Sequence, residues 1–71
     1  MTQKAKERAI QCCINQRETN LNAIKHSMER AWEWIEQNDV KNTQEEFDFI
    51  ESLIKWNAEI KEEMESYKKN K

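Results

Sequence analysis

The chain runs for 71 residues without a single glycine or proline. In a helix interior, glycine is about 1 kcal/mol and proline about 3 kcal/mol less favourable than alanine, and both residues favour sharp turns. A chain without them has no strong helix breaker. Apolar side chains also return every three or four residues, the spacing that places them on one face of a helix. The sequence therefore predicts an all-α protein.

One polar segment interrupts the helical pattern. Its short side chains bond readily to their own backbone and favour turns; they are Asn38, Asp39, Asn42 and Thr43. Thr43 is followed three residues later by Glu46, the spacing of a capping box, so we expect the second helix to begin at this threonine. The predicted boundaries are a first helix over about 3–37, a turn over about 38–43 and a second helix over about 44–69.

The apolar positions follow a repeat of 3.5 residues, which is typical of helices that pack as a coiled coil. In the first helix the predicted seam consists of Ile10, Ile14, Arg17, Leu21, Ile24, Met28, Ala31 and Ile35. In the second helix it consists of Ile50, Leu53, Asn57, Ile60, Met64 and Tyr67. A short connection makes two such helices antiparallel neighbours. The predicted fold is a single domain over residues 1–71, an antiparallel two-helix hairpin, with dimerisation into a four-helix bundle as an option.

Aromatic residues near the predicted turn exceed what one facing helix can cover. Such surplus apolar surface predicts self-association or docking on another protein, and tryptophan is enriched among the residues that anchor interfaces. The predicted contact residues are Trp32, Trp34, Phe49 and Trp56. Among the tryptophans we expect Trp34 to be the most exposed. Packing within the core or within a homodimer is the alternative interpretation of the same residues.

Two polar residues lie in the predicted seams. Such residues lower stability but fix register and oligomeric state. We expect Arg17 to lie opposite Met64 and Asn57 opposite Ile24, so that the two polar side chains do not pair within one chain. Both are therefore included among the predicted partner-binding residues. The alternative is that Arg17 reaches Glu63 or solvent, while Asn57 sets the register of the hairpin.

The formal net charge of -2 conceals a strongly acidic second helix. Its outer face carries Glu59, Glu62, Glu63 and Glu65. These carboxylates could imitate a row of phosphates and block a nucleic-acid-binding protein, although a solvated face is the simpler interpretation. A small RNA-binding hairpin dimer is a further alternative. It is disfavoured because the basic residues of the first helix share no stripe and no aromatic residue is interleaved with them.

No residue pattern indicates catalysis, a cofactor or a metal site. Cys12 and Cys13 are adjacent, which prevents a disulfide between them in a helix, so both are expected to be free thiols in a reducing compartment. We expect Cys13 to be a small seam residue and Cys12 to be exposed. The single histidine, His26, has no converging set of ligands around it. No signal peptide or membrane span is recognisable, which favours a cytoplasmic location.

The sequence thus favours a small non-enzymatic protein-interaction module. The expected roles are those of an inhibitor, an adaptor or a regulatory subunit that binds or occludes a larger protein. The expected partner is a second copy of the chain or another protein, giving a homodimer or a hetero-complex.

Overall fold

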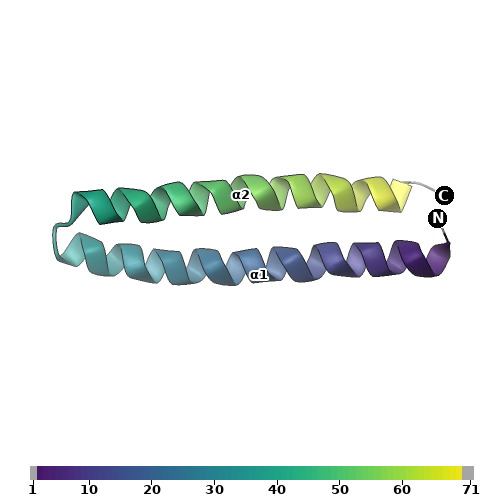
Figure 1. Cartoon of the computed structure of the whole chain (residues 1–71), viewed down its shortest axis with the longest axis horizontal. Coiled ribbons are helices and arrows are strands. Elements are labelled where there is room, and N and C mark those ends of the chain that lie inside the picture. The colour runs from purple at the N-terminus through teal and green to yellow at the C-terminus, as the bar shows by residue number, and fades with distance from the viewer. Residues whose placement is uncertain (1, 70–71) are drawn as a thin grey trace.

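The computed structural model describes residues 2–69 and consists of two long helices joined by a tight turn (Figure 1). Helix α1 spans Gln3–Glu36 and helix α2 spans Val40–Lys69. The helices run antiparallel and side by side over their whole length, so the first turn of α1 and the last turn of α2 lie together at the end away from the connection (Figure 1). The Cα atoms extend over 53 × 14 × 10 Å. The predicted all-α hairpin is confirmed.

Helix α1 begins and ends with standard caps. At its start, the hydroxyl of Thr2 accepts a hydrogen bond from the backbone N–H of Ala5 at 3.1 Å. At its end, Asn38 adopts a left-handed conformation with φ of 58°, which asparagine tolerates better than most residues. The backbone N–H groups of Asn38 and Asp39 then reach back to carbonyls of the last helical turn, at 3.0 and 2.9 Å. This arrangement is a Schellman motif, and it reverses the chain within three residues.

Helix α2 begins at Val40, so the predicted start at a Thr43 capping box is wrong. The carboxylate of Asp39 caps the helix instead. It accepts hydrogen bonds from the backbone N–H of Asn42 at 3.0 Å and from the side-chain amide of the same residue at 2.7 Å. Thr43 lies inside the helix and donates its hydroxyl to the Asp39 carbonyl at 2.7 Å. An ionised carboxylate at a helix N-terminus makes a stronger, charge-assisted cap, and the turn is correspondingly shorter than predicted.

Glu46, the other member of the predicted capping box, points across to the first helix. Its Oε1 accepts a hydrogen bond from Arg30 Nε at 3.0 Å. The Glu46 side chain is only 17% exposed, whereas that of Arg30 is 51% exposed, so this ion pair is partly shielded from solvent. It ties α2 to α1 a short distance from the turn.

The seam of α2 is the predicted one. Ile50, Leu53, Asn57, Ile60 and Met64 are buried, and Tyr67 is half-buried.

The seam of α1 differs from the prediction. The helix turns its smaller residues toward α2, and the buried positions are Cys13, Asn20, Ile24, Ser27 and Ala31. Three predicted seam residues, Leu21, Met28 and Ile35, are exposed instead. The physical reason is that α1 carries two candidate stripes one residue apart, and the small polar stripe makes the inter-helix hydrogen bonds described below.

Prediction for the turn. The hydrogen bonds from the backbone and side chain of Asn42 lower the pKa of Asp39 in the folded chain. A carboxyl group with a lowered folded-state pKa stabilises the fold above its ordinary pKa of about 3.9, and that contribution is lost as the pH falls through the lower folded value. We therefore expect the thermal midpoint to fall between pH 5 and pH 2.

Substitution Asp39→Asn keeps a capping oxygen but removes the charge, so it should flatten this part of the pH profile, measured by circular dichroism. Glu45→Gln removes an exposed acid of the same helix and serves as the control. An unchanged profile in Asp39→Asn would contradict the role of the ionised cap.

Candidate protein interface

A layer of polar side chains lies between the helices near the middle of the hairpin. Asn20 donates its side-chain amide to the Asn57 Oδ1 at 2.7 Å, and both residues are buried. Gln16 donates to the Asn20 Oδ1 at 3.0 Å. The Asn57 amide points to the Arg17 backbone carbonyl at 3.4 Å. Amide groups removed from water need such partners, so these bonds fix which residues of the two helices face each other.

This layer corrects the predicted register. Asn57 lies opposite Asn20 rather than Ile24, and it has its partner within its own chain. Arg17 contributes its backbone carbonyl to the layer, whereas its side-chain Nε is buried without a hydrogen-bond partner. Of the two explanations for Asn57, the structure supports the one in which it sets the register of the hairpin.

The polar layer separates two small apolar clusters. Toward the open end, Cys13, Ile60 and Met64 form the buried cluster. Toward the turn, Ile24 packs with Ile50 and Leu53. Ile10 and Ile14 of α1 also pack against the first cluster, and Ala23 packs against the second. Several large apolar residues of α1 lie outside both clusters.

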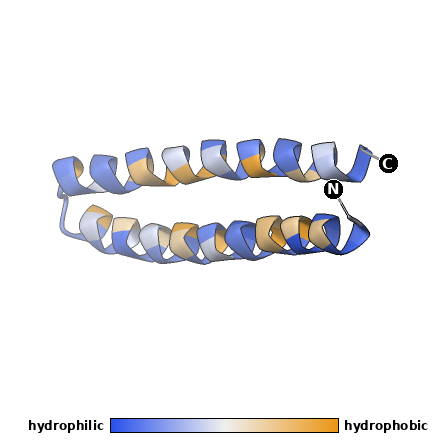
Figure 2. Ribbon diagram, turned by 45° about the vertical axis from the view of Figure 1, so that its right-hand side comes forward, coloured by the Kyte–Doolittle hydropathy of each residue, from blue (hydrophilic) through white to orange (hydrophobic). Residues whose placement is uncertain are grey.

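Those residues form a surface that we call the apolar face. Its members expose 45% to 79% of their area, and they are Leu21, Met28, Trp32 and Ile35 of α1 with Val40, Phe47 and Ile54 of α2. In Figure 2, hydrophobic segments accordingly recur along both helices among hydrophilic ones.

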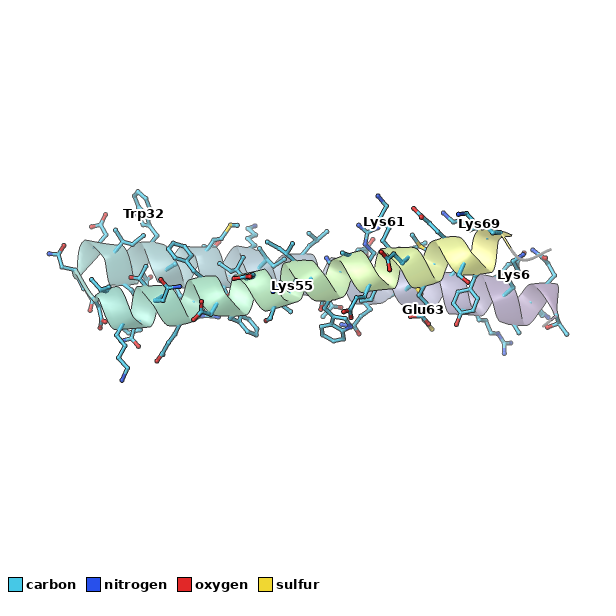
Figure 3. The ribbon with its side chains drawn as sticks, turned by 90° about the horizontal axis from the view of Figure 1, so that it is seen from above. Lys6, Trp32, Lys55, Lys61, Glu63 and Lys69 are labelled. Atoms are coloured by element: carbon cyan, nitrogen blue, oxygen red, sulfur yellow. The ribbon has the colours of Figure 1, made fainter. Side chains whose placement is uncertain are left out.

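Both helices contribute to the same side of the hairpin. In an antiparallel pair of helices, the residues that come one position after a seam residue lie on the same side of the molecule in both helices. One shallow groove runs along α1 past Leu21, Met28 and Trp32. A second groove crosses between the helices and is lined by Ile35 together with Phe47. Figure 3 shows Trp32 of α1 projecting from the same edge of the hairpin as Lys61 of α2.

The predicted aromatic contact residues do not form one cluster. Trp32 belongs to the apolar face, whereas Phe49 and Trp56 are exposed on the opposite side of α2. Trp56 there lines a separate groove with Cys12 and Gln16.

Trp34 is half-buried beside the seam, and Trp32 is 66% exposed, so the prediction that Trp34 is the most exposed tryptophan is wrong. The cause is the rotation of α1, which brings the position of Trp34 toward α2.

Sequence reasoning missed Leu21, Met28 and Ile35 as surface residues, because their spacing fits a coiled-coil seam as well as the true buried stripe does. The signal that could have found them is the pair of asparagines. Asn20 belongs to the stripe Cys13, Asn20, Ser27 and Trp34, and a buried partner for Asn57 selects that stripe.

The four acidic residues predicted as an alternative site are exposed on α2. Glu63 accepts a hydrogen bond from the Tyr67 hydroxyl at 3.1 Å, and this bond raises the pKa of the tyrosine. Lys61 lies within the same stretch, and Lys55 pairs with Glu51 at 3.1 Å one turn earlier. The negative field of this face is therefore diluted by nearby cations.

The thiols and the histidine are placed apart from one another. Cys12 is exposed and Cys13 is buried, as predicted, and both are free. The pKa of the Cys13 thiol is raised, mainly by burial and to a smaller extent by the charges of Glu63 and Cys12. His26 lies 3.5 Å from the Glu29 carboxylate on the outer face of α1. Within residues 2–69 no three His, Cys, Asp or Glu side chains converge as a metal-binding group would.

Neither of the two described helices contains an apolar stretch that could cross a membrane. The chain has no significant match to any protein-family model, curated protein or solved structure.

Prediction for the polar layer. Replacing either Asn57 or Asn20 alone with Leu should leave the other buried amide without its partner, which costs about 1–3 kcal/mol of unfolding free energy. Replacing both residues with Leu removes both polar groups together and should recover most of that loss. Urea unfolding at one fixed chain concentration, for both single variants and the double variant, measures the coupling. Additive losses, with no recovery in the double variant, would show that the two side chains do not interact.

Proposed function

We propose that this chain is a non-enzymatic protein-interaction module whose contact surface is the apolar face. The observation that carries the proposal is the position of that face. The seam of α1 buries Ser27 and Asn20, while Leu21 and Met28, each one residue further along, remain exposed.

The energetics favour a covering partner. Fully burying a side chain such as leucine or methionine stabilises a protein by about 1.5–3 kcal/mol relative to leaving it exposed. Single exposed apolar residues are common on protein surfaces, but a contiguous apolar patch marks an interaction site. Near the turn the apolar face is continuous from one helix to the other, because Ile35, Val40 and Phe47 line a common groove.

A slender hairpin of this kind suits occlusion or bridging. It offers a long, rigid surface, since each helix is capped at its N-terminus and the turn is held by backbone hydrogen bonds. We propose accordingly that it serves as an inhibitor, an adaptor or a regulatory subunit. Two free thiols agree with a reducing compartment, which we propose is the cytoplasm.

The acidic mimic of a nucleic acid is the second candidate. In its favour, Glu59, Glu62, Glu63 and Glu65 are all exposed. Against it, the acidic row is short, and Lys55 lies one turn before Glu59 on the same helix, where it pairs with Glu51 at 3.1 Å. Binding through carboxylates should weaken steeply with added salt, whereas binding through the apolar face should change little.

Prediction for the apolar face. A photoreactive benzoylphenylalanine in the substitution Met28→benzoylphenylalanine should form a covalent product with a protein when it is irradiated, because this position lies at the centre of the proposed contact. The measurement is the yield and composition of the product by mass spectrometry, in purified chain and in cell lysate.

The matched control is Asn22→benzoylphenylalanine, which places the same group at an exposed position of the same helix outside the apolar face. It should give little product. A folded Met28 variant that forms no protein product above the Asn22 background would refute the proposed function, whichever protein was expected as the partner.

A further inference from the structure

We propose that the apolar face is covered by a second copy of the chain, in a four-helix bundle that carries both turns at the same end. This inference rests on the proposed function, since it names a second copy as the protein that the apolar face contacts. An inhibitory, adaptor or regulatory role then belongs to the assembled bundle, whose apolar faces are closed.

The hairpin leaves more surface exposed than a compact protein of its mass. Its accessible surface is 5668 Å². A compact monomeric protein of 8.6 kDa is expected to expose about 4,700 Å². The excess is about 1,000 Å², close to the roughly 800 Å² that each partner buries in a stable protein–protein interface. The excess accessible surface of one hairpin is therefore close to the area that the hairpin would bury in a dimer.

The core of a single hairpin is small. Among the described residues, the largest side chain that is completely buried is that of Ser27. The larger apolar residues of both clusters keep 6% to 9% of their area exposed. Two facing helices cannot enclose a core, whereas four helices enclose one along a common axis. A second hairpin packed on the apolar face would add its own Leu21, Met28 and Ile54 to the core of the first hairpin.

The apolar face covers only one half of the length of the hairpin. Its residues lie in the half nearest the turn, from Leu21 to Ile54. The corresponding positions of the other half carry the charged residues Glu7, Lys61 and Lys68 together with the half-buried Ile14. When two hairpins overlap over their whole length, their apolar halves face each other only if both turns lie at the same end. The opposite orientation would place apolar side chains against these charges, which must then lose hydration.

In the favoured orientation, each α1 lies beside the α2 of the second copy, and residues keep the same height along the bundle. Heights follow from the Asn20–Asn57 pair. Lys25 is five residues after Asn20, and Glu51 is six residues before Asn57, so the two lie at nearly the same height on the rim of the face. Lys25 of one chain therefore faces Glu51 of the second copy.

A second charge match follows from the same register. Glu18 is two residues before Asn20, and Lys61 is four residues after Asn57. Their heights differ by about 3 Å at 1.5 Å per residue, within reach of the long lysine side chain. Both pairs join opposite charges when one hairpin is rotated by 180° about the bundle axis, and Glu51 also pairs with Lys55 of its own chain.

The first test is the mass in solution, by sedimentation equilibrium over a wide range of concentrations. The unsubstituted chain should approach twice the chain mass of 8.6 kDa. Met28→Glu and Ile54→Glu should each be monomeric, because each would bury two unpaired carboxylates in the bundle. Phe49→Glu is the matched control, since it makes the same change at a similarly exposed apolar residue on the opposite side. It should remain a dimer.

The second test is the orientation. A nitroxide label in the substitution Lys41→Cys, with Cys12→Ser and Cys13→Ala, reports the distance between the two turns by pulsed electron resonance. Turns at the same end predict a distance of the order of the bundle width, well below the 53 Å length of the hairpin. This measurement changes no residue of the apolar face, so it remains decisive if a glutamate variant fails to fold.

The outcomes separate this inference from the proposed function. A folded monomer at all concentrations overturns the inference, and so does a dimer that only Phe49→Glu disrupts or one whose labelled turns lie at opposite ends. In each case the proposed function survives if residue 28 still forms a covalent product with a protein other than this chain.

Discussion

The hydrogen bond between the side chains of Asn20 and Asn57 determines how the two helices meet. At 2.7 Å and out of solvent, it joins groups that would each be costly to bury alone. Shifting the helices by one turn would separate them and leave both amides without partners. An apolar seam alone permits several registers of similar energy, because one aliphatic contact can replace another. The hydrogen-bonded asparagine pair permits only one register, at some cost in stability.

The same bond determines which residues of α1 reach the surface. The helix has two stripes one residue apart, and pairing with Asn57 turns the stripe of Cys13, Asn20 and Ser27 inward. The neighbouring stripe, with Leu21 and Met28, is consequently exposed beside the seam. The pairing of Asn20 with Asn57 thus determines both the register of the two helices and the apolar surface that remains exposed. The apolar face is large because the seam of α1 is small and polar.

The fold class was predictable from the sequence, since a chain without glycine or proline and with a 3.5-residue repeat has few alternatives to a long hairpin. The seam of α2 was predicted correctly, because only one of its stripes contains Ile50, Leu53 and Ile60. The seam of α1 was not, since hydrophobicity favoured Leu21 and Met28 over Asn20 and Ser27. The start of α2 was misplaced because two capping patterns compete there, and the charged cap at Asp39 forms. Both errors arose where a polar interaction between residues outweighed a local pattern.

The most direct test of this account is the pattern of side-chain contacts in solution, from nuclear Overhauser effects within one chain. These are separated from contacts between chains by mixing labelled and unlabelled protein. The account predicts contacts between the amides of Asn20 and Asn57 within one chain, and none from the Met28 methyl group to Ile50 or Leu53 of its own chain. Contacts of Met28 with Ile50 and Leu53 of the same chain, with no contact between the asparagines, would show that the hydrophobic stripe forms the seam and would contradict it.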